Sequence, residues 1–186
     1  MAATMRVNRR VGTIGAPTDI NVTAAGTKLT VDDANNGTTG ILIPQSGGVV
    51  ACAIPASLIL ECTAATGSTV SNKRISFNGA VPTGFGFYCN TEGTGSNPTS
   101  ATYAQTTVAP TGVQSVIGAG ALGTANYVWV GGGVANTTTA YDSTSAVVAA
   151  PGMVGKYCKV VLALDATATE VGVVPLPSLV MTYDES

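Results

Sequence analysis

The stretch Lys156-Tyr157-Cys158-Lys159-Val160-Val161-Leu162-Ala163-Leu164 decides the fold class of this chain. It begins with mixed polar and apolar residues and ends as a continuous apolar run, which predicts a β-strand that is half-exposed at its start and buried at its end. Pro151-Gly152 precedes the stretch and Asp165 follows it, and residues of this kind commonly bound strands. This is the most strongly predicted strand of the chain.

Shorter β-rich runs occur throughout the rest of the sequence, and most of them are bounded by Gly, Pro or Asn-Gly. No window of the chain shows the 3.6-residue apolar period of an amphipathic helix. We therefore predict an all-β fold, namely a β-sandwich, jelly roll or barrel-like fold, with long Thr/Gly-rich loops. The predicted runs lie at residues 20–22, 28–31, 41–43, 49–53, 58–62, 74–77, 84–89, 126–130, 171–174 and 179–183, and the predicted loops at 90–109 and 135–145.

The composition is poor in charge and lacks histidine. Only 10% of the 186 residues are charged, whereas about 25% is usual in soluble proteins, and 27 threonines and 23 glycines are present instead. The absence of histidine excludes Ser-His-Asp and Cys-His nucleophiles and every zinc site that uses a histidine ligand. The ten carboxylates are scattered and form no obvious pair for general acid–base catalysis. We expect no enzyme activity, no cofactor and no metal site.

The few charges are distributed unevenly. Arg6, Arg9 and Arg10 come before the first acidic residue, Asp19, whereas the chain beyond residue 10 holds five basic and ten acidic side chains. We predict an extended basic N-terminal arm, or alternatively a first edge strand, at residues 1–19 and a single β-rich domain at residues 20–186. Because the body is acidic, we expect the arm to anchor on a protein surface rather than on nucleic acid.

The start of the sequence predicts no secretory signal, and the cysteines show no metal-binding spacing. No apolar run is long enough for a secretory signal or a membrane span, so we expect a chain made in the cytoplasm. The four cysteines form no CxxC pair, which favours buried free thiols over a metal site. The alternative is a disulfide between Cys52 and Cys62 that forms after release from a reducing cell.

Two aromatic segments are candidates for binding. Phe85 and Phe87 alternate with glycines, which predicts a core strand or a strand at an interface. Tyr127 and Trp129 lie on the strand predicted at residues 126–130. Their rings could stack on a sugar, or they could be part of the hydrophobic core.

The segment GKYCKVVLALDATATEVGVVPL at residues 155–176 resembles the closing segment of small structural proteins of tailed phages, in particular capsid decoration or cement proteins. In these proteins a strand that ends in Ala-Leu-Asp-Ala is followed by a small-residue turn and a short valine-rich strand. The resemblance implies a β-rich, often trimeric protein on the outside of an icosahedral shell, where it clamps neighbouring major capsid subunits. It implies no catalytic residues.

The predicted partners are therefore the major capsid protein and further copies of this chain, and the predicted location is the capsid surface. The predicted contact elements are the basic arm with Arg6, Arg9 and Arg10, the aromatic residues Phe85 and Phe87, and the acidic tail with Asp184 and Glu185. Two alternatives remain open. One is another virion component, such as a shell jelly roll, a tail tube or a fibre base, and the other is a carbohydrate-binding adhesive β-sandwich that uses Tyr127 and Trp129.

Overall fold

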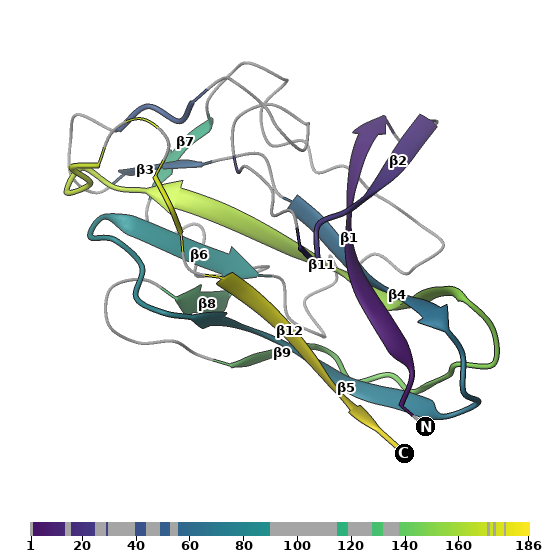
Figure 1. Ribbon diagram of the computed structural model, residues 1–186. Coiled ribbons are helices and arrows are strands. Elements are labelled where there is room, and N and C mark those ends of the chain that lie inside the picture. Colours follow the sequence, from purple (N-terminus) through teal and green to yellow (C-terminus); the bar gives the residue numbers. More distant parts are fainter. Residues whose placement is uncertain are drawn as a thin grey trace.

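The computed structural model of the chain is all-β in the part that it describes (Figure 1), as the sequence predicts. It describes residues 2–13, 16–24, 29, 40–43, 49–52, 56–89, 115–118, 128–131, 138–170, 172, 174–176 and 178–186. No helix occurs among these residues, so none of them forms a helix that could span a membrane. Each strand pairing between them is antiparallel.

The described strands form one large and one small sheet. The large sheet has the order β2-β1-β4-β11-β3-β7, and β6 pairs with both β11 and β8. The small sheet has the order β10-β5-β12, and β9 also pairs with β5. The large sheet consists of β1 (Thr4–Thr13), β2 (Ala16–Asn21), β3 (Val49–Cys52), β4 (Ala56–Ala64), β6 (Phe85–Cys89), β7 (Ser115–Gly118), β8 (Val128–Gly131) and β11 (Gly152–Leu164). The small sheet consists of β5 (Thr69–Asn78), β9 (Thr139–Asp142), β10 (Ala146–Val147) and β12 (Ser178–Glu185).

The strand predicted at 156–164 is the C-terminal part of β11, which begins four residues earlier, and it organises the large sheet. β11 pairs with β4 and β3 along one edge and with β6 along the other. Residues 160–164 are all buried, because their two faces contact other parts of the protein. The apolar run at the end of this strand therefore supplies much of the core.

The core contains side chains from both sheets. One cluster combines Leu58 of β4, Phe87 of β6 and Leu162 of β11 with Ile75 and other residues of the small sheet. A second cluster combines large-sheet residues with Val70 of β5, and Met181 of β12 packs against both clusters. Hydrophobic burial thus holds the two sheets together.

Several short predicted runs differ from the structure. Residues 41–43 are outside any strand, because Ile41 and Ile43 pack against the core without joining a sheet. The predicted loop at 135–145 contains strand β9, whose Tyr141 and Asp142 are fully buried. The run at 28–31, apart from Leu29, and the loop at 90–109 lie outside the described residues.

Candidate functional site

The N-terminal segment that the sequence predicts as an extended arm lies within the large sheet. Residues 4–13 form β1, which pairs with β2 along one edge and with β4 along the other. Arg9 points away from solvent and is 1% exposed, so its side chain offers almost no surface to a partner. The basic cluster therefore belongs to the folded body of the protein.

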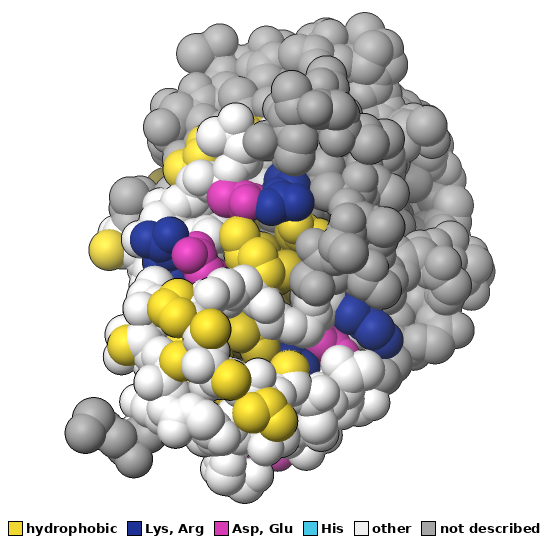
Figure 2. All heavy atoms as spheres, turned by 90° about the vertical axis from the view of Figure 1, so that its right-hand side faces the viewer, with side chains coloured by type: hydrophobic (Ala, Val, Ile, Leu, Met, Phe, Trp, Pro, Cys, Tyr) yellow, Lys and Arg dark blue, Asp and Glu magenta, His cyan; other side chains and the backbone are white. Residues whose placement is uncertain are grey.

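Arg6 and Arg10 make ion pairs on the outer face of this sheet. The Nε atom of Arg6 lies 2.8 Å from Oε2 of Glu61, and Asn8 donates a hydrogen bond to the same oxygen. Arg10 pairs with Asp19 on β2, and its guanidinium carbon lies 5.3 Å from the centre of the Tyr157 ring. Figure 2 shows basic side chains beside acidic ones on this face, with hydrophobic side chains next to them.

The two phenylalanines predicted as partner contacts are core residues. Phe85 is 6% exposed and Phe87 is 1% exposed, and the ring centres of Phe77 and Phe87 are 4.2 Å apart. A partner cannot reach Phe87 without opening the core between the sheets. Of the two roles that the sequence left open for this strand, the structure places these residues in the core.

The predicted acidic tail is the end of strand β12, where both acids have partners within the chain. Asp184 accepts hydrogen bonds from Arg74 and Asn72. Glu185 accepts hydrogen bonds from the Ser68 hydroxyl and, at 2.8 Å, from the backbone N–H of Ala3. Glu185 therefore links the last strand to the residue just before the first strand.

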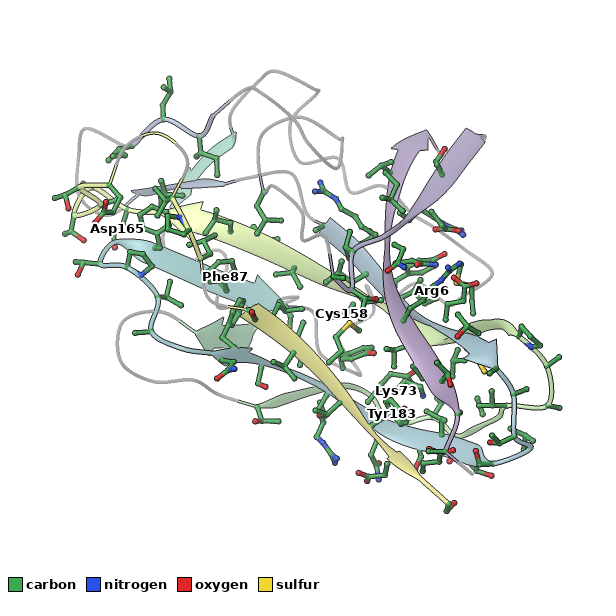
Figure 3. All side chains as sticks on the ribbon, in the orientation of Figure 1. Arg6, Lys73, Phe87, Cys158, Asp165 and Tyr183 are labelled. Atoms are coloured by element: carbon green, nitrogen blue, oxygen red, sulfur yellow. The ribbon has the colours of Figure 1, made fainter. Side chains whose placement is uncertain are left out.

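A Lys–Asp ion pair is buried between the two sheets, and its lysine, Lys73, is labelled in Figure 3. Lys73 extends from β5, and its Nζ atom lies 3.0 Å from Oδ2 of Asp142 on the neighbouring strand β9. Both side chains are 0% exposed. We call Lys73 and Asp142, together with Thr144, which is itself exposed but contacts both side chains, the buried polar centre.

Hydrogen bonds satisfy the buried polar centre from three sides. Oδ1 of Asp142 accepts the Thr144 backbone N–H at 3.0 Å and the Thr144 hydroxyl at 2.5 Å. Oδ2 accepts the backbone N–H of Lys156, on β11, at 2.9 Å. The Nζ atom of Lys73 also donates to the Thr144 carbonyl at 2.7 Å. The centre thus connects the small sheet to the large one through Lys156.

Gly155 creates the space for this centre. Its backbone is left-handed, with a φ of +79°, and it lies where the pairing of β11 with β4 shifts register. A Cβ atom at this position would overlap Oδ2 of Asp142 and the Lys73 side chain. Only glycine satisfies both the backbone conformation and the close approach.

The electrostatics of the centre favour a charged carboxylate. Burial by itself raises the pKa of Asp142, but the hydrogen bonds from Thr144, Lys156 and Lys73 together outweigh burial and lower the pKa. On the outer face, the hydrogen bond from Arg6 is the main cause that lowers the pKa of Glu61. Both carboxylates are therefore acceptors for several donors rather than proton donors near neutral pH.

The structure describes three of the four cysteine side chains but not the predicted aromatic pair of Tyr127 and Trp129. Cys62, Cys89 and Cys158 are free and buried, as predicted for these three positions, whereas the side chain of Cys52 lies outside the described residues. Burial raises the pKa of Cys158, with a further contribution from Cys89, so its thiol is a poor nucleophile. Tyr127 and the side chain of Trp129 lie outside the described residues.

The comparisons and the search for metal ligands give no further assignment. Among the residues that the structure describes, no group of three or more Cys, Asp or Glu side chains could hold a metal ion. Comparison with protein-family models, with curated proteins and with solved structures found no match for this chain.

One half of the buried polar centre could have been found from the sequence pattern. Lys73 is in phase with the buried residues Ile75 and Phe77, so strict alternation already places a lysine on the inner face of β5. Asp142 gave no such signal, because it lies in a Thr-rich segment far from Lys73 in the sequence.

Proposed function

We propose that this chain is a structural protein of a virus particle, which decorates an icosahedral capsid and stabilises it by clamping neighbouring major capsid subunits. Its own oligomer, a homotrimer or another homo-oligomer, is part of this proposal. The support comes from the resemblance of residues 155–176 to capsid decoration proteins and from the distribution of charge described next.

The observation that carries the proposal is that the described charges are largely paired within the chain. Four ion pairs join β1 to β4, β1 to β2, β5 to β9 and β5 to β12. A paired charge loses less solvation free energy than an unpaired one when a partner covers it, because its counter-ion stays in place. What remains for contact is a surface rich in Thr, Ser and Gly, which loses little side-chain entropy on burial.

We further propose that the two sheets face each other as a β-sandwich. Both hydrophobic clusters contain residues of both sheets, and the buried polar centre bridges them. A sandwich of this kind presents two broad sheet faces and their edges to neighbours, which suits a protein that is held permanently in an assembly.

The proposal changes which residues are expected to touch the capsid. Arg6, Arg10, Asp184 and Glu185 have intramolecular partners, and Phe85 and Phe87 are in the core. We therefore expect the capsid contact to use neutral exposed residues, and we expect Arg6→Gln to leave capsid binding nearly unchanged.

The test is addition of the purified chain to capsid shells that lack it. We expect co-sedimentation with intact shells, no binding to unassembled capsid subunits, and a higher temperature of shell disruption. Shells that neither bind the chain nor gain heat stability would contradict the proposal. Binding at the tail or at a single vertex would favour another virion component.

A further inference from the structure

We propose that Lys73 and Asp142 condense to form an intramolecular isopeptide bond that covalently joins strands β5 and β9. The geometry supports this, because Nζ and Oδ2 are 3.0 Å apart and both side chains are fully buried. The inference does not depend on the proposed function.

The two reacting groups are held together before any reaction occurs. They are directly opposite each other in the antiparallel pairing of β5 and β9. The Thr144 carbonyl holds Nζ at 2.7 Å, and the Lys156 N–H holds Oδ2 at 2.9 Å. Well-oriented groups in one molecule react as if present at roughly 10⁵–10⁸ M, which offsets the loss that amide formation suffers in water.

Burial also favours the product over the starting ion pair. Two charges enclosed between the sheets carry a desolvation penalty, which their mutual attraction offsets only in part. The amide that replaces them is neutral. Condensation therefore removes two buried charges, while an amide N–H remains to donate to the Thr144 carbonyl.

The condensation needs no reactant other than the two side chains, and it releases one water molecule. Nζ first transfers a proton to Oδ2, which gives a neutral amine and a carboxylic acid. The amine then attacks Cγ, and negative charge develops on Oδ1, where the Thr144 N–H and hydroxyl already donate. A second proton passes from nitrogen to Oδ2, the Cγ–Oδ2 bond breaks, and Oδ2 leaves as water.

Thr144 therefore has two opposing effects on the rate. Its donors stabilise the developing oxyanion, but they also stabilise the starting carboxylate and so oppose the first proton transfer. Among the described residues, the hydrogen-bond partners of the pair are Thr144 and the Lys156 N–H, and neither supplies a second carboxyl group that could protonate the leaving oxygen. We therefore expect the bond to form slowly after folding.

The test is the intact mass of the full-length folded chain, measured in denaturant after prolonged incubation. We expect a mass one water molecule below that of the sequence, and a protease digest that contains a branched peptide joining the segments around Lys73 and Asp142. Chain kept in denaturant from the start should retain the full mass, because the groups meet only in the folded state.

Two variants complete the design. Replacing both residues with apolar ones, Lys73→Met with Asp142→Leu, leaves no buried charge without a partner and should give a folded chain of full mass. Thr144→Val should change the rate at which the mass falls while the branched peptide remains the same. Full mass in the folded wild-type chain after incubation would overturn the proposal, and so would water loss that maps to other residues.

Discussion

Lys73 and Arg74 are consecutive residues of β5, and each pairs with an aspartate, but the two pairs lie in opposite environments. Lys73 points between the sheets and meets Asp142, and both side chains are 0% exposed. Arg74 points outward and meets Asp184, where the side chains are 35% and 48% exposed. One strand thus carries a buried and an exposed version of the same interaction.

The difference shows that pairing alone does not determine the contribution of a charge to stability. An exposed pair exchanges water contacts for a partner at little net gain, and salt screens it. A buried pair gains little over apolar packing, but the loss of one partner leaves a charge in a medium that cannot solvate it. The four experiments below test this contrast, starting with the largest expected effect.

Asp142→Ala should have the largest effect, because it leaves the Lys73 ammonium buried with only the Thr144 carbonyl as a partner. Relative to freshly folded wild-type chain of full mass, in which the ion pair is intact, we expect a loss of about 3–5 kcal/mol in the free energy of unfolding, measured by urea denaturation. The control is the double replacement Lys73→Met with Asp142→Leu, which should recover most of this loss. A single variant as stable as the wild-type chain would show that Lys73 is solvated in the folded state.

Gly155→Ala should have the next largest effect. The substitution places a Cβ atom against Asp142 and Lys73 and forces alanine into a left-handed backbone, at a combined cost of about 2–5 kcal/mol. Gly67→Ala is the matched control, since Gly67 has nearly the same φ, +78°, but nothing within 4 Å of the added atom. Gly67→Ala should cost only the backbone part, about 1–2 kcal/mol, in the same urea experiment. If both variants lost the same free energy of unfolding, the side chains of the buried polar centre would have to move and accommodate the methyl group of Gly155→Ala at no cost.

The all-β fold could be predicted from the sequence, because short β-branched runs between turn residues are a local property. β11 was predicted nearly at its observed position, since its apolar run is long enough to be buried on both faces. β9 was not predicted, because its four residues are mostly small and polar and it forms only by pairing with β5. Its burial depends on a strand far away in the sequence.

The site could be predicted less well for the same reason. Three arginines close together in the sequence suggest a free basic arm, but antiparallel pairing places Arg6 beside Glu61 and Arg10 beside Asp19. Local charge counts do not include such cross-strand partners. The Lys73–Asp142 pair likewise arises only from the register of β5 with β9.

Lowering the pH should weaken the outer-face ion pair of Arg6 and Glu61, and we expect its effect on the free energy of unfolding to be smaller than that of Gly155→Ala and larger than that of Arg74→Gln. The hydrogen bond from Arg6 lowers the pKa of Glu61 in the folded chain, so Glu61 stabilises the fold at pH values above its unfolded pKa, about 4.3. This contribution is lost as the pH falls through the lowered pKa. Glu61→Gln should therefore be less stable at neutral pH and should lose less stability than the wild-type chain below about pH 4.3. Parallel curves of unfolding free energy against pH would contradict this assignment.

Arg74→Gln should have the smallest effect, although Arg74 is the immediate neighbour of Lys73. Asp184 keeps the hydrogen bond from Asn72 at 2.8 Å after the change, and water replaces the guanidinium at this exposed position. We expect little change in the urea midpoint, and the small difference should decrease further at high salt because exposed pairs are screened. The matched change on the inner face, Lys73→Gln, should lower the midpoint clearly, because Asp142 loses its buried counter-ion. If the two neighbouring substitutions lowered the midpoint equally, burial would not be what separates the two pairs, and the contrast between the faces of β5 would fail.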